Sequence, residues 1–214
     1  MTQKIHQIRK CLKPSCGFRF PNYLISEQYE FCPKCGAPTD VVEIPYSGMV
    51  GDNGTAASSF QFEVLLDNIR SAHNVGSILR TSDGVGISHI HFCGITPTPD
   101  NQKVIKTALS AEQHIPWTQY WDALEAGNKL IESGHILVAL EGGSESISIF
   151  DFIAIPPQQP VVLVIGNEVS GVDPGLLAIC QKRVWLPMLG IKQSFNVSVA
   201  FGIASFLIRF SELL

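Results

Sequence analysis

A run of five aliphatic residues, Val161–Ile165, ends directly at Gly166, and this run most constrains the fold of the chain. A strand that is apolar at every position is buried on both faces, as in the centre of a parallel sheet covered by helices on each side. Strands of this kind alternate with helical patterns, which predicts an α/β fold. The predicted strands are Phe62–Leu66, His89–Cys93, His135–Leu140, Val161–Ile165 and Val184–Leu186, and the predicted helices are Asn74–Val85, Lys103–Leu109, Asp122–Glu132, Pro174–Cys180 and Asn196–Leu213.

Composition divides the chain of 214 residues into three parts. Residues 1–45 hold four of the six cysteines and few aliphatic side chains. Residues 46–60 are rich in glycine, serine and alanine, which predicts a flexible linker. Residues 61–214 carry the alternating pattern of strands and helices and form the predicted α/β domain.

Two cysteine pairs, Cys11 with Cys16 and Cys32 with Cys35, are separated by fifteen residues. This spacing is typical of a structural Zn²⁺ site with four thiolate ligands, and it predicts a small module resembling a zinc ribbon. The alternatives are two disulfides or four free thiols. We expect no secretion signal, which disfavours disulfides, and a segment so poor in aliphatic residues needs a metal in order to fold. The two other cysteines, Cys93 and Cys180, are expected to act as small buried hydrophobic residues.

The net charge of −4 disfavours broad nucleic-acid binding, for which a basic surface is the usual sign. Residues 1–50 contain six lysines and arginines against four acids, whereas residues 51–214 contain nine against fifteen. Any RNA-binding surface is therefore expected first in the N-terminal module. No apolar run reaches membrane-spanning length, so we expect a cytoplasmic protein with no membrane partner.

Three segments carry polar residues where predicted strands end and helices begin. The first contains Asn74 and Arg80, which by themselves are compatible with a helix N-cap and a solvated arginine. In the second, Gly166 precedes a turn that lacks the lysine of a phosphate-binding loop. The third contains Ser194 and Asn196, either of which is a suitable N-cap for the last helix. Each segment alone is only weakly informative.

Together, in this order, the three segments resemble the motifs of the SpoU/TrmH branch of the SPOUT RNA methyltransferases. The resemblance extends from about Phe62 to Leu214 and leaves out the cysteine module. One departure is Asn167, which stands where the family often has a small residue. The matching positions are Asn74, Gly76, Ile78, Arg80 and Thr81 in the first motif, Gly166, Glu168 and Gly171 in the second, and Leu186, Pro187, Met188, Gly190, Ser194, Asn196, Ser198 and Ala200 in the third.

The resemblance implies a parallel sheet with helices on both faces, a deep trefoil knot at the C-terminal end, and a homodimer. It also implies that S-adenosylmethionine (AdoMet) is the methyl donor, held by three loops of the knot. The cofactor-binding residues expected by position are Leu140, Gly142, Ile165, Gly166, Asn167, Leu186, Met188, Ser194, Phe195 and Asn196.

The implied reaction is methylation of a ribose 2′-OH in a structured RNA, either tRNA or rRNA, with no DNA substrate expected. The expected catalytic residues are Arg80, Asn74, Glu168, Ser194 and Asn196. Arg80 is almost always protonated, so we expect it to lower the pKa of the hydroxyl or to hold a phosphate, with the general base left unassigned. Two alternatives remain open: a non-catalytic RNA- or ribosome-binding protein on the same fold, and methylation of a base or of a substrate other than RNA.

Overall fold

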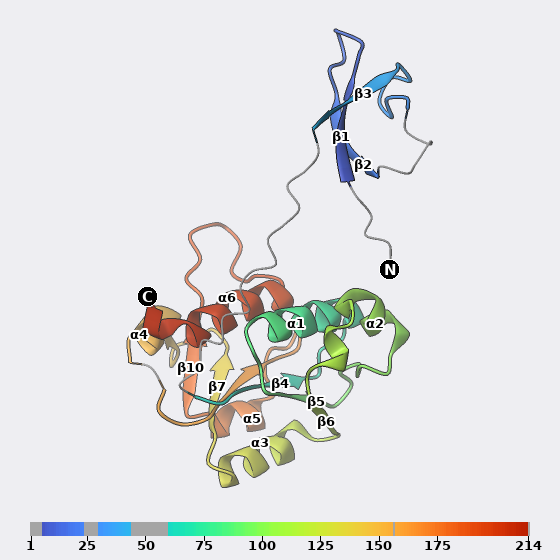
Figure 1. The fold of residues 1–214 in the computed structure, drawn as a ribbon. Helices are drawn as coiled ribbons and strands as arrows, with labels where there is room; N and C mark the ends of the chain where they lie inside the picture. The colour runs from blue at the N-terminus through green and yellow to red at the C-terminus, as the bar shows by residue number, and fades with distance from the viewer. Residues whose placement is uncertain (1–5, 24–29, 44–59, 156, 214) are drawn as a thin grey trace. The chain divides into compact units, whose positions relative to one another are not determined.

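The computed structural model describes residues 6–23, 30–43, 60–155 and 157–213. The chain forms two compact units, Met1–Ala56 and Ala57–Leu214, which are described separately (Figure 1). Most of the predicted linker, residues 46–59, lies outside the described residues. Phe60, its last predicted residue, is buried in the core of the second unit. Within the described part of the chain, no helix is long and apolar enough to cross a membrane.

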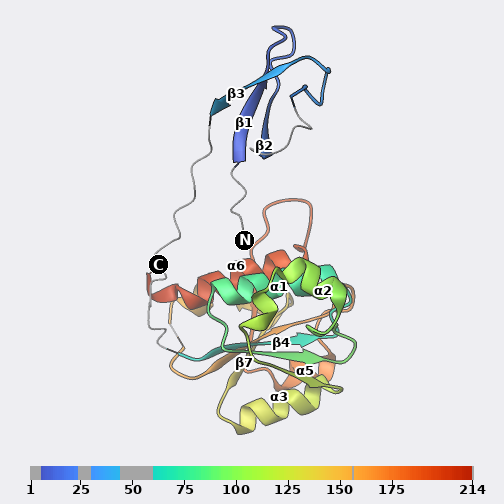
Figure 2. The ribbon, with the colours of Figure 1, turned by 45° about the vertical axis from the view of Figure 1, so that its right-hand side comes forward.

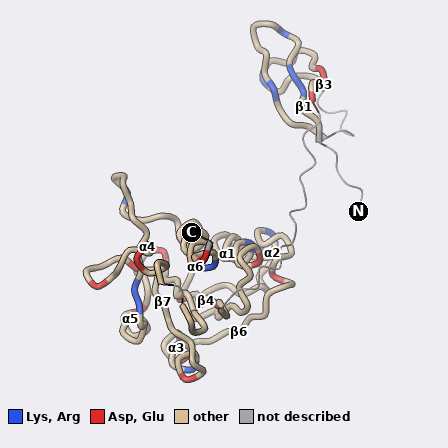
Figure 3. Tube along the Cα trace, turned by 60° about the vertical axis from the view of Figure 1, so that its left-hand side comes forward, with Lys and Arg blue, Asp and Glu red and all other residues tan. Residues whose placement is uncertain are grey.

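The N-terminal unit is a three-stranded antiparallel sheet in the order β2-β1-β3. Its strands are β1 (His6–Cys11), β2 (Arg19–Tyr23) and β3 (Thr39–Glu43). Among its described residues, Cys11 and Cys32 are the only buried hydrophobic residues. Basic residues lie on β1 and acidic residues on β3 (Figure 3). Such a small unit, with almost no apolar core, depends on another source of stability.

The second unit contains a seven-stranded sheet in the order β6-β5-β4-β9-β7-β10-β8. All of its strand pairings are parallel, as predicted from the apolar strands. The central strand β9 is buried at all five positions. The strands are β4 (Phe62–Asp67), β5 (His89–Cys93), β6 (Trp117–Tyr120), β7 (Ile136–Leu140), β8 (Ile147–Ser148), β9 (Val161–Ile165) and β10 (Lys182–Trp185).

Helices cover both faces of this sheet (Figures 1 and 2). One hydrophobic core lies beneath α1 (Ala72–Gly84), α2 (Gln102–Ala108), α4 (Ile149–Ile153) and α6 (Val197–Arg209). The other lies beneath α3 (Ala123–Glu132) and α5 (Pro174–Ile179). Two short 3₁₀ turns, Ala111–Gln113 and Ser211–Leu213, complete the unit.

Most predicted elements are present within one or two residues of their expected bounds. Asp122 and Asp173 cap α3 and α5, as their positions indicated. Helix α1 begins earlier than predicted, because Ser71 is its N-cap and Asn74 lies inside its first turn. The predicted last helix is split, since α6 ends at Arg209.

Three short elements of the second unit, β6, β8 and α4, were not predicted from the sequence. Strand β6 reads Trp-Thr-Gln-Tyr and lies at the edge of the sheet, where a strand is only partly buried and its apolar pattern is weak. Strand β8 has two residues and α4 has five, both too short for a periodic signal. The trefoil knot stays a prediction.

A buried Glu–His pair lies on the α3 face of the sheet. Glu63 on β4 accepts a hydrogen bond from Nε2 of His91 at 2.8 Å, and both side chains are almost fully buried. Nε2 of His135 lies 3.6 Å from the other carboxylate oxygen. Burial raises the pKa of Glu63, but the hydrogen bond and charge of His91 outweigh it, so this pKa lies below its usual value of 4.5.

We expect Glu63→Gln to lower the free energy of unfolding at pH 7 by about 2 kcal/mol, because it weakens a buried hydrogen bond to a charged group. A pKa depressed by folding means that the ionised carboxylate stabilises the fold above the unfolded-state pKa. That stabilisation is lost as the pH falls through the folded-state value, so the variant and the wild type should converge at pH values below it. Urea unfolding from pH 7 down to acid pH checks both points. The control is Glu125→Gln, in an exposed pair with Lys129, which should change the stability little. A difference that stays constant with pH would contradict the assignment.

Candidate active site

A cavity of about 580 Å³ lies where the carboxyl ends of β7, β9 and β10 meet the start of α6. This edge of a parallel α/β sheet is where ligands usually bind, and the volume lies in the range of small-molecule sites. The residues that line it are Leu140, Glu141, Gly142, Ile165, Gly166, Asn167, Glu168, Val169, Gly171, Trp185, Leu186, Met188, Gln193, Ser194, Phe195, Asn196, Val197 and Ala200.

All ten residues expected to bind the cofactor line this one cavity, although they come from three separate stretches of the chain. Their role in binding stays a prediction. Several other lining residues were not predicted, among them Glu141, Trp185 and Gln193. Each of these lies one residue away from a position that was named. Because adjacent residues of a loop line the same cavity wall, the position of these three residues beside predicted ones could have identified them.

Glu168 joins the second motif to the start of α1. Its two carboxylate oxygens accept hydrogen bonds from the backbone N–H groups of Arg70 at 2.9 Å and Ser71 at 3.1 Å. A carboxylate is favoured there because the N-terminus of a helix carries partial positive charge. Burial raises the pKa of Glu168, but the N–H of Arg70 and the amide of Asn74 outweigh it, so this pKa lies below its usual value of 4.5.

Asn74 connects all three motifs through its side-chain amide. Its Nδ2 donates to Glu168 at 2.9 Å, and its Oδ1 accepts from Nδ2 of Asn196 at 3.2 Å. Asn196 is the N-cap of α6, and its own Oδ1 accepts from the N–H and the hydroxyl of Ser198. A continuous chain of hydrogen bonds therefore holds the starts of α1 and α6 against the turn that follows β9.

The turn that follows β9 depends on Gly166 and Asn167. A Cβ added at Gly166 would lie only 2.3 Å from backbone atoms of Gly171 and Val172, so glycine is required for the chain to pack against itself. From the sequence, Gly166 was predicted only as a motif position and a cofactor-binding residue. Asn167 accepts from the N–H groups of Val169 and Ser170, and its Nδ2 donates to the carbonyl of Asn68 at 2.7 Å. Asn167, which stands where the family often has a small residue, thus supports the turn.

Two of the expected catalytic residues, Arg80 and Ser194, lie outside this chain of hydrogen bonds. Arg80 is exposed on α1 and does not line the cavity. Asn74, also expected to be catalytic, forms its side-chain hydrogen bonds with Glu168 and Asn196. Ser194 is exposed and lines the cavity. Within one chain, Arg80 is therefore separate from the other four expected catalytic residues.

We expect Glu168→Gln to reduce the stability of the first turn of α1 by about 1 kcal/mol, because the charge that faces the helix N-terminus is lost. Loosening of Asn74 and Asn196 should also slow any reaction in the cavity, which steady-state kinetics on RNA would measure. Glu132→Gln, an exposed change elsewhere in the unit, is the matched control. If both variants unfold at the same urea concentration as the wild type, the proposed role of Glu168 is wrong.

The four cysteines of the N-terminal unit form a second candidate site. Their sulfur atoms all lie within 4.8 Å of one another, with Cys11 and Cys35 at 3.5 Å and Cys16 and Cys32 at 3.9 Å, and none forms a disulfide. Burial raises the pKa of Cys11 to about 12, whereas the backbone N–H of Ala37 lowers the pKa of Cys35 to about 7. Four converging thiols fit the tetrahedral ligand set that Zn²⁺ prefers.

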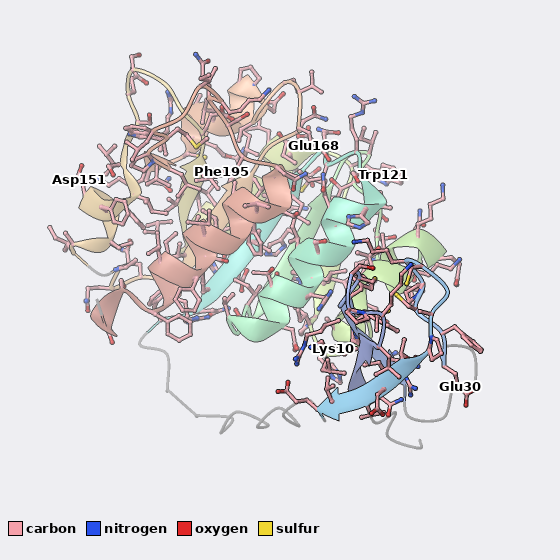
Figure 4. All side chains as sticks on the ribbon, turned by 90° about the horizontal axis from the view of Figure 1, so that it is seen from above. Lys10, Glu30, Trp121, Asp151, Glu168 and Phe195 are labelled. Carbon is pink, nitrogen blue, oxygen red and sulfur yellow. The ribbon has the colours of Figure 1, made fainter. Side chains whose placement is uncertain are left out.

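The described residues of the N-terminal unit contain five basic side chains, Arg9, Lys10, Lys13, Arg19 and Lys34, against the three acids Glu30, Asp40 and Glu43. Lys10 and Glu30 are labelled in Figure 4. Arg19 is paired with Glu43 at 2.9 Å, which leaves Lys10, Lys13 and Lys34 as exposed cations outside the ion pairs of the described part.

The remaining cysteines lie in the second unit. Cys93 is fully buried, as expected, and burial raises its pKa to about 12. Cys180 is only partly buried, at the end of α5, where its thiol donates to the carbonyl of Leu176. Both cysteines therefore serve packing in this unit.

Comparison with known proteins agrees with this geometry. Residues 61–206 match the SpoU rRNA methylase family, and this stretch contains the sheet, the cavity and all three motifs. The chain belongs to this family. The cysteine module lies outside the matched residues.

Named relatives of the chain include RNA-modifying enzymes. A tRNA (guanosine(18)-2′-O)-methyltransferase of Aquifex aeolicus is 33% identical over 143 residues, covering 65% of this chain and 64% of that protein. An enzyme of the same name from Thermus thermophilus is 32% identical, covering 67% and 71%. The chain thus spans slightly less than two thirds of the Aquifex relative.

Solved structures place the second unit among the SPOUT methyltransferases. The crystal structure of the A. aeolicus TrmH/SpoU tRNA modifying enzyme has a TM-score of 0.64 at 26% identity and covers 73% of this chain and 78% of that chain. An AdoMet-bound rRNA methyltransferase from Sinorhizobium meliloti has a TM-score of 0.65 at 27% identity and covers 72% and 57%. The predicted SPOUT sheet is thereby confirmed.

Proposed function

We propose that this protein is an AdoMet-dependent RNA methyltransferase that acts on a ribose 2′-OH of tRNA or rRNA in the cytoplasm. The observation that carries the proposal is the convergence of three separate motifs on one cavity, joined by the hydrogen bonds of Glu168, Asn74 and Asn196. The names of the relatives support the same reaction.

The cavity fits AdoMet in size and in the chemistry of its walls. Leu140, Ile165 and Leu186 offer an apolar surface suited to a purine, while Ser194 and Asn196 offer polar groups for the rest of the molecule. AdoMet supplies an already activated methyl group, so the protein has to bring the ribose hydroxyl into line with it and help remove the proton. Zn²⁺ bound by the four thiols would have a structural role, because protein ligands fill all four of its coordination positions.

We place Arg80 at the ribose hydroxyl, where its positive charge would stabilise the developing oxyanion or hold the adjacent phosphate. Because Arg80 does not line its own chain's cavity, a second copy of the chain is the proposed source of this side chain. Helix α6 presents Val199, Ile203 and Phe206 with exposed fractions of 49%, 37% and 54%. These positions fall on one helical stripe, which suits a homodimer interface.

The test of the function uses purified full-length protein, radiolabelled AdoMet and total cellular RNA. Label in alkali-resistant dinucleotides is the expected result, because a 2′-O-methyl group blocks alkaline cleavage at that ribose. Label that appears only in bases would favour the alternative of base methylation. AdoMet binding with no transfer to RNA would favour the other alternative, a non-catalytic RNA- or ribosome-binding protein.

A further inference from the structure

Trp121 is the most exposed aromatic residue among the described part of the chain, with 85% of its surface accessible. It is the single residue between the end of β6 at Tyr120 and Asp122, the N-cap of α3. Both neighbours are held in place. The carbonyl of Tyr120 accepts from the N–H of Gly94 at 2.9 Å, and the Asp122 carboxylate accepts from two backbone N–H groups of α3. A large aromatic ring is therefore presented to solvent from a rigid support.

A second apolar side chain lies on the neighbouring strand end. Ile95 follows Gly94, which is bonded to Tyr120, and it is 67% exposed. Its N–H donates to Oδ1 of Asn68 at 3.2 Å, which ties this loop to the end of β4. Neither side chain contributes to a hydrophobic core, so folding gives no reason for an aliphatic residue and a tryptophan at these two positions.

Trp121 and the cavity both lie at the carboxyl ends of the parallel strands. Strands β6, β5, β4 and β9 are consecutive neighbours, and Glu168 follows β9. Three strand spacings separate the ends of β6 and β9, which amounts to about 14 Å. Figure 4 shows Trp121 and Glu168 at the same end of the sheet. A few nucleotides of an RNA strand can span the distance from a ribose in the cavity to the tryptophan ring.

Two exposed cations on the segments that follow β4 and β5 are free to contact a polyanion. Arg70, after β4, and Lys103, in the first turn of α2, are exposed, and neither takes part in an ion pair of the described residues. The carboxylates of Asp122 and Asp173 each cap the start of a helix, and that of Asp100, in the loop after β5, accepts from the hydroxyl of Thr98 at 3.4 Å. The core of a protein–protein interface is instead depleted of charged residues.

We propose that Trp121 stacks on an unpaired base of the RNA, a few nucleotides from the target ribose, with Arg70 and Lys103 holding the intervening phosphates. Aromatic side chains bind RNA in this way only where a base is free of a duplex. The proposed contact therefore requires an unpaired base within a few nucleotides of the target ribose. The inference rests on the proposed methyltransferase function, which sets the position of the ribose.

The test measures binding separately from turnover. Full-length protein is titrated with two fluorescein-labelled probes, a single-stranded pool of 20 random nucleotides and a blunt 20-base-pair RNA duplex. We expect Trp121→Leu to weaken binding of the single-stranded pool about tenfold, as is typical for the loss of one stacked base. Trp121→Phe should recover most of this affinity, and the Kd for AdoMet should not change. Phe150→Leu is the matched control, because Phe150 is an exposed aromatic residue on α4, which follows β8, and β8 and β6 are the two opposite edge strands of the sheet.

Several results would overturn the assignment. These are equal affinity of wild type and Trp121→Leu for the single strand, equal loss in Trp121→Leu and Phe150→Leu, and wild-type binding that is no tighter to the single strand than to the duplex. A change of oligomeric state in Trp121→Leu, measured by light scattering, would instead assign the residue to a protein interface. If the binding results hold while no RNA is methylated, the proposed function fails and the stacking surface stands.

Discussion

Arg80→Ala is expected to lower the kcat of RNA methylation about 10³-fold while the Kd for AdoMet stays within about twofold of the wild type. The side chain is exposed and lies outside the cavity wall, so its removal leaves the cofactor site intact. What is lost is the positive charge near the hydroxyl at the moment its proton leaves. Single-turnover kinetics and calorimetric titration with AdoMet give the two quantities. Equal loss of both would contradict the role assigned to this residue.

The proposed dimer makes a sharper version of this experiment possible. Gly142 lines the cavity, and no atom lies within 4 Å of a Cβ added there, so Gly142→Trp should fill the cavity without disturbing the backbone. Each of the variants Arg80→Ala and Gly142→Trp should by itself show little or no methylation of RNA. Mixed dimers should recover part of the activity if Arg80 acts on the partner's cavity. Absence of recovery, with mixed dimers confirmed by mass spectrometry, would place Arg80 and the cavity in the same chain.

Cys32→Ser is expected to release the metal and unfold the N-terminal unit. Binding of a structural Zn²⁺ contributes about 10 kcal/mol or more to such small folds, and this unit has almost no other core, since Cys11 and Cys32 are its only buried hydrophobic residues among those described. The expected results are loss of zinc by atomic absorption and rapid proteolysis of the first 43 residues. The melting temperature of the second unit should be unaffected.

Cys180→Ser provides the control for this experiment, because it removes a thiol from the second unit and should leave the zinc content unchanged. Zinc retained by Cys32→Ser would contradict the four-thiolate site. The affinity for RNA is a separate readout. If it is unchanged when the unit unfolds, the module is structural or binds another partner, and RNA recognition belongs to the α/β unit.

The sequence was most informative where one physical signal dominated. Strand β9 starts where predicted because it is an unbroken apolar run. Strands β4 and β5 also start where predicted, although each carries a buried polar residue, Glu63 and His91. Helices α3 and α5 start where predicted because an aspartate caps each of them. The signal failed for β6, which is partly exposed at the sheet edge. Asn74 was also ambiguous, since a polar residue near a helix start is equally suited to the cap and to the first turn.

Sequence alone determined the α/β class, the cysteine cluster and ten of the residues that line the cavity, because strand burial, ligand spacing and motif order are local properties of the chain. Only the tertiary structure decided which of those residues form hydrogen bonds or pack against one another. The carboxylate of Glu168 and the amide of Asn74 are ninety-four positions apart, yet they are hydrogen-bonded. Gly166 is required by backbone five residues further along the chain, and Trp121 stands at the same edge as the cavity. Such relations depend on strand order and on packing distances, which arise only when the sheet is assembled.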